Sequence, residues 1–147
     1  MDSEEHGFRA LPLTTGVYEI LHLRAGTNDR IVRAGGTDCE GILYVGRAKG
    51  SNTLRSRIRL FWAAANECSD WPANRKPTYN DVKKAHSGGN TYVLCGFRRL
   101  YPLNELWVRW AEDDEPSASE VALIQNYAWE FLDRPPLNST MSRQRWT

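Results

Sequence analysis

A single glutamate stands in an apolar helical stripe near the end of this sequence. The positions that share one helix face at i, i+3, i+4, i+7 and i+11 are Glu120, Leu123, Ile124, Tyr127 and Phe131. A carboxylate on such a face has to be paired, protonated or bound to a metal ion, because an isolated buried charge is costly. A lone carboxylate suits Mg²⁺, which keeps several waters and takes phosphate oxygens as ligands. The alternative is local, because Ser117-x-x-Glu120 also matches a capping box.

An arginine and two tyrosines are further side chains that could take part in chemistry. Arg57 lies one helical turn from Leu54 and Phe61, at the edge of an apolar helix face. There it either reaches out to solvent along its apolar stem or holds a guanidinium against a phosphate and stabilises developing charge. Tyr18 and Tyr44 are typical half-buried strand residues. A free tyrosine has a pKa of about 10, so acting as a base near neutral pH requires cationic neighbours or a metal ion.

Positive charge is concentrated in the middle third of the chain, although the whole chain carries only +1. Between residues 47 and 99, eleven basic residues oppose three acidic ones, which gives +8. Such a block fits a polyanionic partner such as nucleic acid, and equally a solvated basic face. The candidates for contact with nucleic-acid phosphates are Lys49, Arg55, Arg59, Arg75, Lys76, Lys83 and Lys84. The last four fall in an expected insertion at about 63–90, where Trp71 could stack on a base.

Five short motifs occur in an order that resembles the GIY-YIG nuclease family. In chain order they are Gly16-Val17-Tyr18, Tyr44-Val45-Gly46, Arg57, Glu120 with Leu123-Ile124, and Arg134-Pro135-Pro136-Leu137-Asn138. A tripeptide alone carries almost no information, whereas five elements in the family's order are specific. The resemblance covers most of the chain.

The resemblance implies a metal-dependent endonuclease that hydrolyses phosphodiester bonds in DNA by a one-metal mechanism. It implies that Glu120 holds Mg²⁺, with Mn²⁺ as a substitute, and that Arg57 binds the scissile phosphate. Tyr18 would serve as the base and Tyr44 would support it, although the residues alone do not divide those roles. Asn138, after two prolines, would fix a loop at the active site.

Two positions depart from the family pattern. Many relatives have a lysine after the second motif, where this chain has Arg47 before Lys49. Arginine does not release its proton, so Arg47 could bind phosphate or lower a tyrosine pKa but could not be a base. Phe61 stands where relatives often carry Tyr or His, one turn beyond the arginine. These changes leave open a catalytically silent module that binds nucleic acid without cutting it.

The elements that must position these residues are short strands and helices. Strands are expected, from apolar runs and from β-branched and aromatic content, at 16–23, 30–33, 42–46, 91–97 and 106–111. The run at 42–46 is expected to be a buried central strand. Helices are expected at 53–66, 80–86 and 117–132. This order favours an α+β fold with a small mixed or antiparallel central sheet flanked by helices.

The sequence pattern predicts one nuclease-like domain at 13–140, with a polar lead-in at 1–12 and a short tail at 141–147. Cys39, Cys68 and Cys95 are widely spaced, which argues against a disulfide framework or a zinc cluster and favours a reduced compartment. The acidic start lacks signal-peptide features and no run is apolar enough to span a membrane, so we expect a cytoplasmic protein. His6, His22 and His86 form no ligand-spaced group and are assigned no role.

The expected partner is DNA of unknown strandedness, with RNA not excluded. Specificity could come from a homodimer or from a separate protein. A different class stays open as well: a protein-interaction domain that meets its partner through exposed tryptophans such as Trp71 or Trp146. Such a domain would show no affinity for nucleic acid that depends on the basic block.

Overall fold

The computed structural model describes residues 7–138 and confirms the expected α+β class. Strand β1 (Gly16–Arg24) is the middle strand of the main sheet. It pairs antiparallel with β5 (Ile42–Ala48) on one side and with β6 (Leu106–Glu112) on the other. All of the strand pairings in this sheet are antiparallel. Of the two sheet types expected from the sequence, mixed or antiparallel, the described residues therefore form the antiparallel one.

Three short strands lie between β1 and β5 in the chain. Strand β2 (Thr27–Asn28) returns on the end of β1 through a two-residue turn. Strands β3 (Ile31–Arg33) and β4 (Gly36–Asp38) then form a separate two-stranded sheet. The expected short strand at 30–33 is therefore present.

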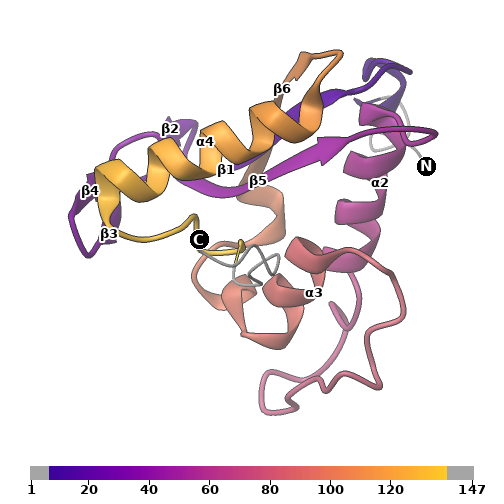
Figure 1. The fold of residues 1–147 in the computed structure, drawn as a ribbon. Coiled ribbons are helices and arrows are strands. Elements are labelled where there is room, and N and C mark those ends of the chain that lie inside the picture. The colour runs from indigo at the N-terminus through magenta and orange to yellow at the C-terminus, as the bar shows by residue number, and fades with distance from the viewer. Residues whose placement is uncertain (1–6, 139–147) are drawn as a thin grey trace.

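Three α-helices cover the two faces of the main sheet. Helix α4 (Pro116–Phe131) lies along one face, whereas α2 (Leu54–Ala65) and α3 (Ser87–Leu94) lie on the other (Figure 1). Two 3-10 turns, η1 (Phe97–Arg99) and η2 (Leu103–Glu105), lead from α3 into β6. Within the part of the chain described here, no helix combines the length and apolar character that a membrane crossing needs.

Helix α2 follows its sequence pattern closely. Thr53 caps its first turn, because the Thr53 hydroxyl accepts the backbone N–H of Ser56 and the Ser56 hydroxyl accepts that of Thr53. The apolar positions at i, i+4, i+7 and i+11 are all buried, as expected: Leu54, Ile58, Phe61 and Ala65. This face lies against the tyrosine-bearing side of the sheet.

Strand β5 is buried along its length, but it is not the central strand. Its register with β1 shifts, because Ile20 faces Tyr44 while Leu21 faces Ile42, which leaves Leu43 as the extra residue of a β-bulge. The bulge turns Leu43 and Tyr44 toward α2 and α3, while Ile42 and Val45 pack with α4. A continuous apolar run therefore arises from two covered faces and a change of register.

The segment at 80–97 departs from the sequence prediction. The expected helix at 80–86 is absent from the structure, and the expected strand at 91–97 is instead the helix α3 followed by η1. Thr91, Tyr92 and Val93 are β-branched or aromatic, yet all three are buried on this side of the molecule. A side chain at Gly89 would come within 2.6 Å of the Ala64 methyl group. Close helix–helix packing therefore overrides the local strand preference.

The expected boundaries also change at two places. Within the expected polar lead-in at 1–12, Leu11 is only 3% exposed and belongs to the core. The expected insertion at 63–90 begins inside α2 and ends inside α3, so the irregular part is 66–86. The expected tail at 141–147, with Trp146, lies outside the described residues.

Candidate functional site

The two motif tyrosines lie on the same face of the sheet, on neighbouring strands. Tyr18 of β1 is opposite Gly46, and Tyr44 of β5 is opposite Ile20, which places the two rings diagonally with centroids 6.0 Å apart. Both side chains are buried rather than half-buried, with exposures of 1% and 6%. A side chain at Gly46 would come within 2.6 Å of the Tyr18 hydroxyl and of the Tyr44 ring. The second motif therefore requires glycine for packing.

The environment of the tyrosines keeps their hydroxyls protonated in the free protein. Burial raises the pKa of Tyr18 well above its ordinary value, the negative charge of Glu120 adds to this rise, and Arg57 opposes it. Burial likewise raises the pKa of Tyr44, again with Glu120 raising and Arg57 lowering it. Both tyrosines thus sense the same carboxylate and the same guanidinium. A phenolate would require further positive charge at the site.

Glu120 pairs across the structure rather than within its helix. Helix α4 begins at Pro116 with Glu115 as its N-cap and without a side-chain cap, so the capping box at Ser117 does not form. Instead Arg47 Nη1 donates to Glu120 Oε1 at 3.1 Å. Burial raises the pKa of Glu120, and the cations Arg47, Arg57 and Lys49 counteract part of that rise.

The donor set fits a divalent ion only in part. Glu120 Oε2 receives no hydrogen bond from the described residues, so one carboxylate oxygen is available. No group of three His, Cys, Asp or Glu side chains within residues 7–138 could cage a metal. Mg²⁺ held by one carboxylate would keep several waters. The three neighbouring cations repel a bare divalent ion, whereas a phosphodiester would offset their charge.

Arg57 projects from α2 toward this cluster. Its positive charge lowers the pKa of Tyr18, Tyr44, Glu120 and His86, four groups from four different elements. The side chain is half-buried, so the guanidinium is fixed in part by packing. An anion bound at this point would be neutralised by a group that cannot lose its proton.

Asn138 closes the outer edge of β5. Its Oδ1 accepts the Val45 N–H at 2.9 Å and its Nδ2 donates to the Val45 carbonyl at 2.8 Å. The neighbouring Leu137 N–H donates to the Leu43 carbonyl at 2.7 Å. The side chain therefore acts like a strand residue and fixes the backbone beside Tyr44. Both polar atoms of the Asn138 amide are engaged in this contact with Val45.

The sequence prediction assigned no role to His86, which the structure places inside the cluster. His86 Nε2 lies 2.8 Å from the Tyr18 hydroxyl. The imidazole also packs edge-on against Phe61 at 5.3 Å between ring centroids, and lies 5.4 Å from Tyr44. The residue is 1% exposed. No spacing signal marks it, because it comes from an irregular segment far along the chain from either tyrosine.

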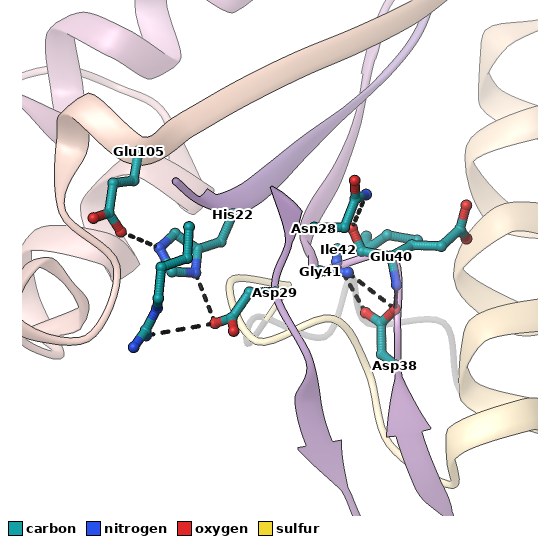
Figure 2. Close-up of polar contacts among 9 residues, drawn as sticks. His22, Asn28, Asp29, Asp38, Glu40, Gly41, Ile42 and Glu105 are labelled. Carbon is teal, nitrogen blue, oxygen red and sulfur yellow. Dashed lines mark hydrogen bonds and ion pairs between the residues drawn. The ribbon is translucent and has the colours of Figure 1, made fainter. Parts of the chain in front are cut away.

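His22 is also buried, at a separate polar cluster shown in Figure 2. Its Nδ1 lies 2.8 Å from Asp29 Oδ2 and its Nε2 lies 2.6 Å from Glu105 Oε2. The two nitrogens point to opposite sides of the ring, so they cannot bind one metal ion together. In the same view Asp38 accepts the backbone N–H groups of Gly41 and Ile42. These contacts hold β1, η2 and the turn into β5 in place.

The basic candidates for phosphate contact differ in exposure and in their contacts. Lys49 is exposed and near Glu120, whereas Arg55 is half-buried and donates to the carbonyls of Arg9 and Leu11. Arg59 is exposed, with its guanidinium 6.0 Å from the Phe8 ring centroid. The remaining candidates are exposed on the 66–86 segment: Arg75, Lys76, Lys83 and Lys84.

An aromatic and basic pair stands out on this segment. The Arg75 guanidinium lies 3.5 Å from the centre of the Trp71 ring. The segment is anchored, because the backbone N–H groups of Lys83 and Lys84 both donate to the Glu67 carboxylate at 2.7 Å. In such a pair, the tryptophan ring can stack on a base and the guanidinium can contact a phosphate.

An apolar pocket lies elsewhere in the described residues. It has a volume of about 260 Å³ between residues 7–11, α2 and β6, and its wall includes Phe8, Trp62 and Trp110. None of the residues within 7–138 that line it is titratable. The chemistry-bearing side chains are therefore not in this pocket but at the edge of β5.

Comparisons of the chain with protein-family models, with curated proteins and with solved structures gave no match. The GIY-YIG resemblance therefore rests on the order of the five motifs in the sequence.

Proposed function

We propose that this chain is a metal-dependent endonuclease that hydrolyses phosphodiester bonds in DNA. The observation that carries the proposal is the placement of the two tyrosines on neighbouring strands, with ring centroids 6.0 Å apart, beside Arg47 of the same strand β5, which pairs with Glu120 of α4 at 3.1 Å. The charges of Arg57 and Glu120 both act on the two tyrosines. Perturbed titratable groups gathered in this way mark functional sites more often than chance. A fixed guanidinium beside a carboxylate and phenols suits an anionic transition state.

In the proposed reaction Arg57 binds the scissile phosphate and stabilises the charge that develops on it. Glu120 would hold Mg²⁺, or Mn²⁺ in its place, and the bound ion supplies charge neutralisation at the phosphate and the leaving oxygen. Tyr18 would first release its own proton to solvent, which the positive charge of Arg57 favours, and its phenolate would then accept the proton of the attacking water, with Tyr44 in support. Arg47, which donates to Glu120 in this structure, would bind the phosphate instead if Glu120 held the ion, because a guanidinium and a divalent ion at the same carboxylate repel each other.

The test is cleavage of end-labelled single-stranded, double-stranded and branched DNA, and of RNA, with Mg²⁺, Mn²⁺ or chelator. Wild type should cut at least one DNA in a metal-dependent way, and Glu120→Ala should abolish cutting while it retains much of the binding. Glu130→Ala is the matched control, because Glu130 is an exposed carboxylate on the same helix. Wild-type rates in Glu120→Ala would refute the assignment of the metal ligand.

A second candidate is a nucleic-acid-binding module that does not turn over. Two observations favour it: the tyrosines are buried, and Arg47 already pairs with Glu120. Such a module would bind the same panel with a steep salt dependence and would leave every strand intact in both metals. Arg47→Lys and Phe61→His would then be the first reversions to test for recovered cleavage.

The cellular setting is part of the proposal. Three cysteines remain free, two of them exposed, which fits a reduced cytoplasmic compartment. Specificity would come from a homodimer or a separate partner protein. Light scattering with and without DNA measures the oligomeric state directly.

A further inference from the structure

His86 is held at two points by the residues around it. It is the N-cap of α3, where Gly89 N–H donates to its Nδ1 at 3.2 Å. Its other nitrogen, Nε2, lies 2.8 Å from the Tyr18 hydroxyl. The ring is thus fixed between the start of a helix and the first motif tyrosine.

The packing around α3 leaves this imidazole little freedom. A side chain at Gly88 would come within 2.6 Å of the Tyr44 ring, and one at Gly89 within 2.6 Å of the Ala64 methyl group. Phe61 and Tyr44 cover the ring of His86 itself, with centroids 5.3 and 5.4 Å away. The start of α3 is therefore seated directly on the tyrosine cluster, and His86 cannot swing away without displacing it.

The cap contact decides which nitrogen carries the proton. Nδ1 accepts the Gly89 N–H, so its lone pair is in use and it bears no hydrogen. Burial, followed by the positive charge of Arg57, lowers the pKa of His86 to about 3, so the ring is neutral at ordinary pH. The single proton of a neutral ring must then be on Nε2. Nε2–H consequently donates to the Tyr18 oxygen.

We propose that His86 is a positioning residue for Tyr18, acting as a fixed hydrogen-bond donor to the tyrosine oxygen and not as a base that takes its proton. The inference rests on the proposed nuclease function for its catalytic meaning. A donor at this place orients the Tyr18 hydroxyl and favours its deprotonated form, since a phenolate accepts a stronger hydrogen bond.

The tautomer and the contact are tested by NMR of the full chain. Long-range ¹H–¹⁵N correlation of histidine-labelled protein should show an unprotonated Nδ1 and a protonated Nε2 at His86. A proton on Nδ1 would overturn the proposal. The ring-carbon resonance of Tyr18, assigned with Tyr18→Phe, should move in His86→Asn, which keeps an acceptor at the N-cap but lacks a donor that reaches Tyr18.

A conservative variant separates positioning from folding. His86→Gln places an amide N–H₂ near the Nε2 position. It should therefore bring the Tyr18 ring-carbon resonance part of the way back to its wild-type position, and recover part of the cleavage rate. His86→Asn should lower the turnover on the DNA that wild type cuts best by about 10- to 100-fold, the size expected for one hydrogen bond to a charged group. KM should change little, because His86 is not placed against the substrate.

The outcomes distinguish the two proposals. If wild type cuts no nucleic acid, the nuclease function fails, while the NMR spectra still decide whether His86 donates to Tyr18. If wild type cuts and His86→Asn keeps both the wild-type rate and the Tyr18 resonance, the positioning role fails alone. If His86→Asn does not fold, the tautomer in wild type and the resonance in His86→Gln decide.

Discussion

At the scale of single residues, the glycines of the two tripeptide motifs are set by contact distances. A side chain at Gly16 would come within 2.2 Å of the Ala111 carbonyl oxygen and 2.9 Å of Leu54. At Gly46 it would meet both motif tyrosines. These glycines bring β6 and the tyrosine rings close to the backbone. They therefore belong to the geometry of the site although they carry no reactive group.

Gly46→Ala should destabilise the fold and displace the tyrosines. Overpacking of a full core costs about 1–3 kcal/mol, so the midpoint of urea unfolding should fall accordingly. Gly7→Ala is the control, because among residues 7–138 no atom beyond the chain neighbour lies within 4 Å of a side chain placed there. An unchanged unfolding midpoint in Gly46→Ala would show that the rings can move aside at no cost.

Residue chemistry was predictable from sequence only where it followed helical spacing or a motif. The apolar stripe carrying Glu120 and the position of Arg57 can be inferred from the sequence. The carboxylate's actual partner, Arg47, lies 73 residues away, and a capping box was an equally valid local solution. His86 has neither spacing nor motif, since only the packing of α3 brings it to Tyr18.

At the scale of elements, α3 is a short helix that starts on a buried histidine. The pKa of this imidazole is 6.5 in the unfolded chain, whereas burial lowers the pKa to about 3 in the folded protein. Between these values the unfolded state holds more protons, so stability falls as pH falls. Above about pH 6.5 the effect is fully present and constant.

The acid sensitivity gives a prediction for α3. Between about pH 6 and pH 4 the unfolding free energy of wild type should decrease more steeply than that of His86→Asn, by up to about 1.4 kcal/mol per pH unit. Urea unfolding at several pH values measures both slopes. Parallel slopes would mean that the folded protein protonates His86 as readily as the unfolded chain does.

At the edge of β5, the Asn138 side chain makes the two hydrogen bonds to Val45 that a neighbouring strand would otherwise make. Asn138→Ala leaves the Val45 N–H and carbonyl without their partner and should cost about 1–3 kcal/mol. Asn104→Ala is the control, because Asn104 is exposed. If thermal unfolding shows the same loss in both variants, the contact at β5 contributes nothing specific.

Element prediction succeeded where local pattern and packing agreed and failed where they conflicted. The helices α2 and α4 and the strands β1, β5 and β6 lie close to their expected limits. The strand expected at 91–97 was wrong, because Thr91, Tyr92 and Val93 have strand preference while Gly88 and Gly89 permit close packing of a helix on α2. Tertiary contacts of this kind leave no periodic signal in the sequence.

At the scale of the whole molecule, the basic middle third is divided between structure and surface. Arg98 donates to the carbonyls of Ala65, Glu67 and Cys68, and Arg55 is tied to residues 9–11 in the same way. These guanidiniums close loops, so the net charge of the block overstates what is available to a polyanion. The exposed remainder is the 66–86 segment together with Lys49, Arg59 and Arg99.

This division makes the substrate path measurable by salt dependence. If DNA crosses the 66–86 segment, Arg75→Gln with Lys76→Gln should reduce the slope of log affinity against log salt by about one unit for each phosphate that the variant no longer neutralises. Arg24→Gln is the control, because Arg24 is an exposed cation at the far end of β1. A slope that responds to Lys49→Gln but not to the double variant would instead place the DNA at the Glu120 edge, and the Trp71–Arg75 stack would then serve only to pack the segment.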